Sequence, residues 1–110
     1  MANEHNPFEQ RRIALQYELE ALFGDSVHVY FQPPENLKMV YPAIIYERYN
    51  IDINYATNRV FNTTTEYHVT IVDSDPDSLL VDKMSKFRTA QFVRHYATNG
   101  LNHDIFKIFY

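Results

Sequence analysis

A histidine and an aspartate stand where a tight turn would bring them together. Asn99-Gly100 favours a two-residue hairpin turn, because both residues tolerate the positive φ angles that such a turn needs. That turn places His95 opposite Asp104. An imidazole beside a carboxylate is two-thirds of a hydrolase triad, but none of the serines lies in a nucleophile-elbow motif. A structural cross-strand pair is therefore the favoured interpretation.

Carboxylates give two further candidates for chemistry. Glu66 could pair with Glu47 or with Asp52 for acid–base hydrolysis, but glycosidase carboxylates need a substrate cleft. This sequence gives little sign of a cleft. The run Asp73, Asp75, Asp77 resembles the start of a calcium loop.

An EF-hand loop needs Gly at its sixth position and Glu at its twelfth. Those positions hold Ser78 and Met84, so we interpret the three aspartates as helix-capping residues.

The composition argues further against catalysis. The chain has no cysteine, two glycines and five histidines without helical ligand spacing. Thiol nucleophiles, cysteine-based zinc sites and Gly-rich phosphate loops are thereby excluded. A formal net charge of −4 disfavours a free-standing nucleic-acid binder, which needs a basic surface. We therefore expect a protein that is not an enzyme and holds neither a cofactor nor a metal.

The N-terminal residues and the apolar stretches of the sequence bear on the cellular location of the protein. The N-terminal residues lack a basic segment followed by an apolar run, and no stretch approaches the ~20 apolar residues of a membrane span. We expect an intracellular product with no membrane contact. The 17 aromatic residues, nine Tyr and eight Phe, are many for one core of 110 residues.

Two helices are predicted. Asn6 is a good N-cap with Pro7 at the first helical position, and Gly24 is a good stop. One face of this helix carries apolar residues at helical spacing: Phe8, Leu15, Leu19 and Leu22. A second helix opens in residues 73–78, with Pro76 in its first turn and an apolar stripe formed by Leu80, Met84 and Phe87.

Strands are predicted over residues 27–31, 41–55, 60–72, 90–97 and 101–110, mostly paired as hairpins, with residues 56–59 as a turn. The last hairpin places Tyr96 opposite His103. Residues 37–40 could form a connector or an edge strand, and we expect residues 33–40 to be mobile in the free subunit. The pattern predicts one α+β domain over residues 1–110: a mixed, mostly antiparallel sheet with a long hairpin and two helices packed on it.

The hairpin of residues 41–72 exceeds what a small domain needs. Its arms have about a dozen residues, or near 40 Å at ~3.3 Å per residue. From Tyr41 to Tyr55 the odd positions are mostly apolar, which indicates one buried side. One end should project beyond the core with apolar residues exposed, and such a ribbon usually marks a protein interface. The expected contact residues are Tyr49, Ile51, Ile53, Tyr55 and Phe61. The alternative is a bent hairpin that the helices cover completely.

Several segments carry a resemblance to a known family. They are Tyr41-Pro42-Ala43-Ile44-Ile45-Tyr46 and the stretches 51–56, 66–78 and 102–106. Together they resemble the tail terminator (tail completion) proteins of long-tailed bacteriophages, over residues 7–110.

The resemblance implies an α+β virion structural protein without enzyme activity or cofactor. It implies a homohexameric ring that caps the tail tube and forms the head–tail connector interface at the neck. The implied partners are further copies of the chain, the tail tube protein and the head-completion or stopper protein. DNA would pass through the lumen without sequence-specific binding. The protein would be made in the host cytoplasm and reside in the virion tail.

Three other functions are open. A head-completion or stopper protein of the neck would bind on the portal side. A small α+β ligand-binding or enzymatic domain would need a deep pocket, for which the neighbourhood of His95 and Asp104 is the candidate. A cytosolic module could inhibit another protein through the apolar hairpin.

Overall fold

The computed structural model describes residues 6–110, except for the side chain of Phe61. Its elements are α1 (Pro7–Phe23), β1 (His28–Phe31), β2 (Ala43–Ala56), β3 (Arg59–Asp73), α2 (Leu79–Ser85), β4 (Gln91–Thr98) and β5 (Leu101–Phe109). The predicted strands and helices are all present. The region expected to connect the first two strands has no helix or strand.

The five strands form one sheet in the order β1-β2-β3-β5-β4. β1 pairs in parallel with β2, and the remaining neighbours are antiparallel. The predicted tight turn at Asn99-Gly100 joins β4 to β5, and a second at Thr57-Asn58 joins β2 to β3, each with two positive φ angles. The α+β class and the mostly antiparallel sheet are confirmed.

α1 begins and ends at the predicted residues. Asn6 Oδ1 accepts a hydrogen bond from the Glu9 N–H at 2.9 Å, and Pro7 takes the first helical position. The chain leaves the helix at Gly24, whose φ of 92° suits glycine. The sequence therefore encodes both boundaries of this helix locally.

α2 is shorter than predicted. Ser78, rather than an aspartate of the preceding run, is its N-cap and accepts the Leu80 N–H at 3.2 Å. Asp73 and Asp75 instead accept backbone N–H groups two residues ahead, at 3.1 and 2.9 Å. These short side-chain loops stabilise a turn before the helix, so the aspartates are turn residues and not helix caps.

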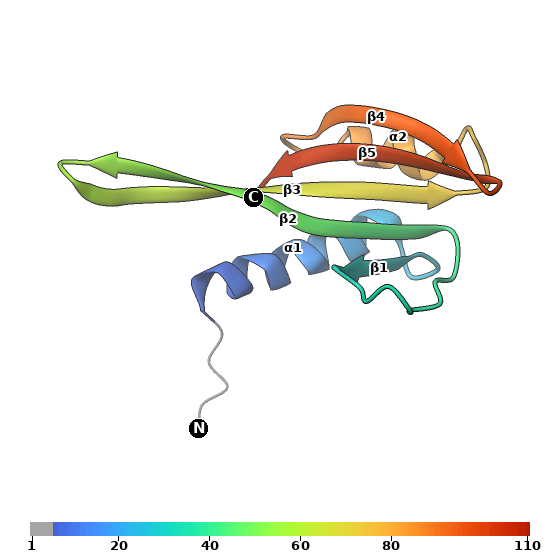
Figure 1. The fold of residues 1–110 in the computed structure, drawn as a ribbon, viewed down its shortest axis with the longest axis horizontal. Coiled ribbons are helices and arrows are strands. Elements are labelled where there is room, and N and C mark those ends of the chain that lie inside the picture. The colour runs from blue at the N-terminus through green and yellow to red at the C-terminus, as the bar shows by residue number, and fades with distance from the viewer. Residues whose placement is uncertain (1–5) are drawn as a thin grey trace, which may run out of the picture.

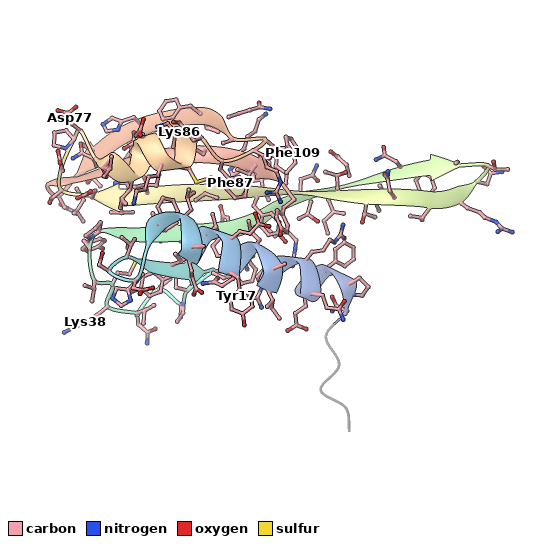
Figure 2. All side chains as sticks on the ribbon, turned by 180° about the vertical axis from the view of Figure 1, so that it is seen from behind. Tyr17, Lys38, Asp77, Lys86, Phe87 and Phe109 are labelled. Atoms are coloured by element: carbon pink, nitrogen blue, oxygen red, sulfur yellow. The ribbon has the colours of Figure 1, made fainter. Side chains whose placement is uncertain are left out.

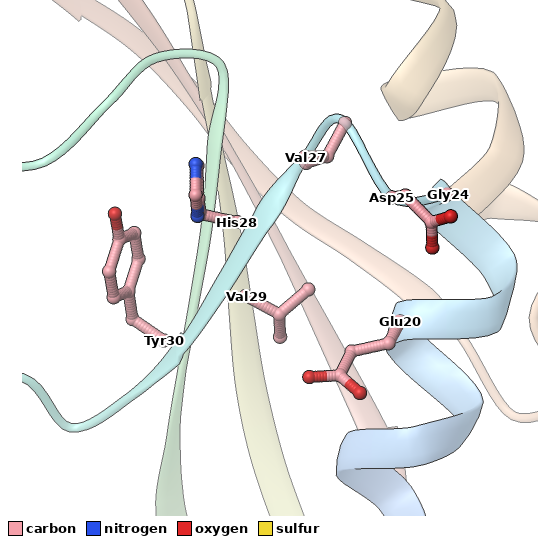
Figure 3. Close-up of a pocket in the computed structure, with 7 residues that line it drawn as sticks. All are labelled: Glu20, Gly24, Asp25, Val27, His28, Val29 and Tyr30. Atoms are coloured by element: carbon pink, nitrogen blue, oxygen red, sulfur yellow. The ribbon is translucent and has the colours of Figure 1, made fainter.

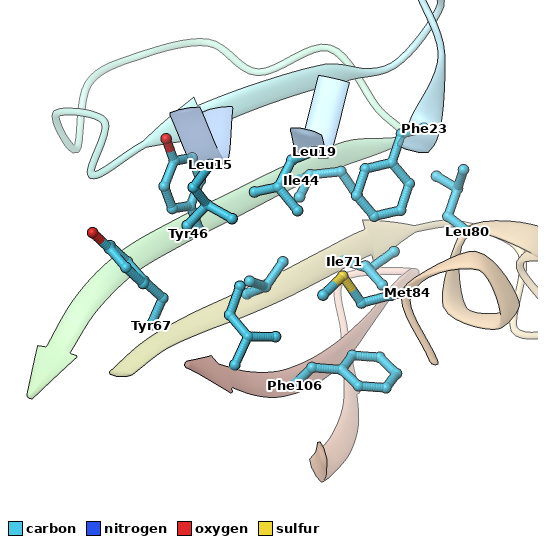
Figure 4. Close-up of a cluster of buried hydrophobic side chains, with 12 residues drawn as sticks. Leu15, Leu19, Phe23, Ile44, Tyr46, Tyr67, Ile71, Leu80, Met84 and Phe106 are labelled. Atoms are coloured by element: carbon cyan, nitrogen blue, oxygen red, sulfur yellow. The ribbon is translucent and has the colours of Figure 1, made fainter. Parts of the chain in front are cut away.

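Both helices pack on the same face of the sheet (Figures 1 and 2). Side chains from α1, α2, β2, β3 and β5 meet there in one buried cluster (Figure 4): Leu15, Leu19, Phe23, Ile44, Tyr46, Tyr67, Val69, Ile71, Leu80, Met84, Phe106 and Ile108. Neither helix of residues 6–110 packs on the opposite face. Leu22 and Phe87 are partly buried against the cluster, whereas Phe8, expected on the same stripe, lies outside it near the N-terminal end of α1.

Candidate assembly interface

The hairpin of β2 and β3 extends past the rest of the sheet (Figure 1). β1 pairs with β2 only as far as Tyr46, and β5 pairs with β3 only as far as Glu66. Residues 50–65 are therefore a two-stranded ribbon, which we call the hairpin arm. The molecule measures 51 Å along its longest axis and 25 Å along its shortest. The predicted projection is confirmed.

A β-bulge between Arg48 and Asn50 changes which face each residue of β2 occupies. Before it, Tyr46 points to the helix-bearing face with the even-numbered positions. After it, Ile51 and Ile53 oppose Thr65 and Thr63 and lie on that same face.

Because of the bulge, the expectation that the odd positions from 41 to 55 share one side is wrong. Tyr49 instead lies on the helix-free face, where its ring stacks on His68 with centroids 3.9 Å apart.

The predicted contact residues differ in exposure. Tyr55 is 66% exposed, Tyr49 62% and Ile53 48%, whereas Ile51 is half-buried. The predicted site at Phe61 falls on a side chain outside the described part of the chain. Val60, 58% exposed and paired with Tyr55, was not predicted. Two adjacent apolar residues, Val60 and Phe61, are followed by a run of polar ones, so the sequence does not indicate on which face Val60 lies.

The base of the hairpin arm is fixed to α1. Arg11 donates from its guanidinium to the carbonyl oxygen of Thr63 at 3.2 Å and to its Oγ1 at 3.0 Å. The Arg11 guanidinium also lies 5.1 Å from the centroid of the Phe8 ring. These contacts hold the first part of the arm while its outer part has no support from the described residues of the chain.

A recess of about 330 Å³ lies beside this base. Phe8, Phe31 and Ile51 supply its apolar surface, and Arg12 and Arg48 border it. Both guanidinium groups lie over the Phe31 ring, at 4.6 and 5.9 Å from its centroid. Ile51 is thus half-buried at this recess, which it lines together with Phe8 and Phe31.

The His95–Asp104 pair forms as predicted. The two residues oppose each other across β4 and β5, with His95 Nδ1 2.8 Å from Asp104 Oδ1. Tyr96 and His103 also oppose each other as predicted, with stacked rings 4.5 Å apart. The Ser78 hydroxyl accepts from the Leu80 N–H, and the Ser85 hydroxyl donates to the Asp82 carbonyl. Within residues 6–110, His95 bonds to Asp104, and no serine or threonine hydroxyl bonds to His95.

The predicted carboxylate pairs do not face each other. Glu47 opposes His68, and Glu66 opposes Asn50. The carboxylate of Glu66 lies 2.9 Å from the ring nitrogen of His68, and Asp52 opposes Thr64. Within residues 6–110 no three His, Cys, Asp or Glu side chains gather in a way that could hold a metal ion.

A polar recess of about 380 Å³ lies between the end of α1 and β1 (Figure 3). Glu20 and Asp25 border it on the helix side, while His28 and Tyr30 extend from β1 and stack on each other at 6.0 Å. It lies apart from His95 and Asp104, so the two observations do not combine into one catalytic site.

Sequence reasoning missed one buried polar group and one polar cluster. Tyr46 is fully buried, and its hydroxyl donates to Gln16 Oε1. Burial raises the pKa of Tyr46 to about 12. The cluster joins Glu18 of α1 to Arg88 and Tyr110, and hydrogen bonds from Arg88 and then Tyr110 lower the pKa of Glu18. Contacts over such sequence separations leave no local signal.

A scan against models of known protein families gives no match, and no curated protein sequence is significantly similar to the chain. Within the described residues, none of the helices combines the length and the apolar character needed to cross a membrane. The geometry of the chain itself is therefore the basis for a functional proposal.

Proposed function

We propose that this chain is a structural subunit that assembles with copies of itself into a ring, as the tail terminator of a long-tailed bacteriophage. The ring caps the tail tube and carries the interface for the head-completion protein. In this proposal the chain has no catalytic role, resides in the virion and lets DNA pass through the lumen. Its net negative charge suits a channel to which DNA should not adhere.

The observation that carries the proposal is the hairpin arm. Its outer part leaves Ile53, Tyr55 and Val60 about half or more exposed on a ribbon paired only with itself. A two-stranded ribbon is marginal in water unless an apolar face is covered. A partner that covers these side chains would remove apolar area from water and fix the ribbon.

The resemblance of residues 41–46, 51–56, 66–78 and 102–106 to tail terminator proteins supports the choice of assembly. A protruding arm on one side of a subunit favours a heterologous contact, in which the arm of each copy meets a different surface of the next. Such contacts form closed rings when the rotation between copies returns to its start.

Light scattering of the purified chain tests the proposal. We expect a species of about six times the 13.1 kDa chain mass, either alone or after mixing with the tail tube protein of the same phage. Electron microscopy of the mixture should show rings at tube ends. Binding to the portal side instead would identify a stopper protein. A monomer that neither assembles nor caps tubes would contradict the proposal.

A further inference from the structure

The sheet ends in β4 on one side and in β1 on the other, and beyond β1 the outer edge of β2 is uncovered. β4 is the last strand in the order β1-β2-β3-β5-β4, and all eight of its residues are exposed. Its side chains include large apolar ones, namely Phe92, Val93 and Tyr96. An exposed strand edge of this kind is a ready surface for pairing with another strand.

The hairpin arm has two outer edges, and they differ. On β3, the Thr63 carbonyl already accepts from Arg11 at 3.2 Å, and the Thr65 carbonyl accepts from the Tyr110 N–H at 3.0 Å. On β2, the Gln32 N–H donates to the Tyr46 carbonyl at 3.0 Å, and Gln32 Oε1 accepts from the Arg48 N–H at 3.1 Å. These are the last hydrogen bonds on that edge.

Beyond Arg48, no backbone hydrogen bond from residues 6–110 reaches the outer edge of β2. Residues 50–56 of β2 are therefore the free edge of the arm.

The two free edges carry opposite charge. Residues 50–56 contain one acid, Asp52, and no base, whereas β4 contains Arg94 and no acid. Asp52 opposes Thr64 and Arg94 opposes Ile105, and both pairs lie on the helix-free face of the sheet. A strand pairing that continues the sheet would therefore place both charges on the same face, within reach of each other.

We propose that β4 of one copy pairs with residues 50–56 of the next, with Arg94 opposite Asp52 of the neighbouring copy. The inference rests on the proposed self-assembly and names its contact. Because the two edges lie on opposite sides of the sheet, the contact is heterologous and joins each copy to two neighbours, as a closed ring needs. Pairing of β4 with β4 would instead stop at a dimer.

The absence of cysteine permits a direct test by disulfide trapping. One chain carries Arg94→Cys and a second, tagged chain carries Asp52→Cys, and the two are mixed under mild oxidation. A disulfide requires Cα atoms within ~7 Å. We expect a mixed dimer of one tagged and one untagged chain. The control replaces Arg94→Cys by Lys38→Cys, in the loop between β1 and β2 at the end of the molecule away from the hairpin arm (Figure 2).

Mixed dimers no more abundant than with the Lys38→Cys control would overturn the inference, as would dimers made only of Arg94→Cys chains. A chain carrying both cysteines gives a second readout. Within one copy β4 and β2 are three strand spacings apart, ~14 Å, so its disulfides must join different copies. We expect a ladder of covalent oligomers from this double variant.

Charge reversal separates this inference from the proposed function. Arg94→Asp should weaken self-association by about tenfold, and adding Asp52→Arg should restore it. Lys38→Asp makes the same charge change away from the proposed contact and should leave self-association unchanged. If the wild-type chain assembles but these variants assemble equally well, the β4 contact is wrong and self-assembly stands. If the wild-type chain does not assemble under any condition, the proposed function itself fails.

Discussion

The guanidinium of Arg88 donates two hydrogen bonds to the carboxylate of Glu18, at 2.9 and 3.2 Å, across 70 residues of sequence. The Tyr110 hydroxyl donates to the same carboxylate. One acidic side chain on α1 thus joins the segment after α2 to the end of β5. The sheet end from which the hairpin arm leaves is held by this cluster and by Arg11.

Glu18→Gln should destabilise the fold modestly at neutral pH, because exposed ion pairs contribute little. Hydrogen bonds from Arg88 and Tyr110 lower the pKa of Glu18 in the folded state. The stabilisation is therefore present above the unfolded-state pKa and is lost as the pH falls through the folded-state pKa. Thermal unfolding from pH 7 down to about pH 3 checks this.

In that series the wild-type and Glu18→Gln melting temperatures should differ at neutral pH and converge in acid. Glu35→Gln, in the exposed loop before β2, removes the same charge and should match the wild type throughout. A constant gap between Glu18→Gln and wild type at every pH would show that the carboxylate charge is not the cause.

Tyr46 predicts a loss of stability in alkali. Burial raises its pKa to about 12, so in the folded state it keeps its proton where an unfolded chain would lose it. The stabilisation is complete below the ordinary tyrosine pKa and is lost as the pH rises toward 12. Denaturant unfolding at pH 8 and 11 should show that Tyr46→Phe loses about 1–2 kcal/mol less than the wild type over this interval. Equal losses would contradict the assignment.

Two positions of α2, one buried and one exposed, provide a matched test of the core. Met84 is fully buried, whereas Leu79 on the same helix is 65% exposed. Met84→Ala should lower the free energy of unfolding by about 2–5 kcal/mol, since it leaves a cavity. Leu79→Ala should change it by less than about 0.5 kcal/mol. Urea unfolding of both variants checks the pair, and similar losses would mean that α2 packs on its other face.

Local signals explain why much of the fold was predictable. Asn6 and Gly24 mark the ends of α1, and Asn99-Gly100 marks the last turn, because each residue type suits one backbone conformation or one hydrogen bond. Tertiary packing is not needed to read such signals. The α+β class and the pairing of His95 with Asp104 followed from them.

The faces of the hairpin arm were not predictable in the same way. One extra residue at the bulge between Arg48 and Asn50 shifts the two-residue period, so Tyr49 and Ile51 lie on opposite faces. An alternating sequence contains no mark of such a shift. The Glu18–Arg88 pair was equally out of reach, since its partners meet only when both helices dock on the sheet.

The hairpin arm as a self-assembly surface is the central claim, and one comparison tests it most directly. Ile53→Lys places a charge on the exposed apolar face of the arm, and Asn36→Lys adds the same charge in the loop before β2. Light scattering of both variants and the wild type, alone and with the tail tube protein, gives the assembled mass, and thermal unfolding confirms that each folds. We expect Ile53→Lys to melt like the wild type yet remain a monomer, and Asn36→Lys to assemble. Assembly of Ile53→Lys to the wild-type mass would contradict the claim.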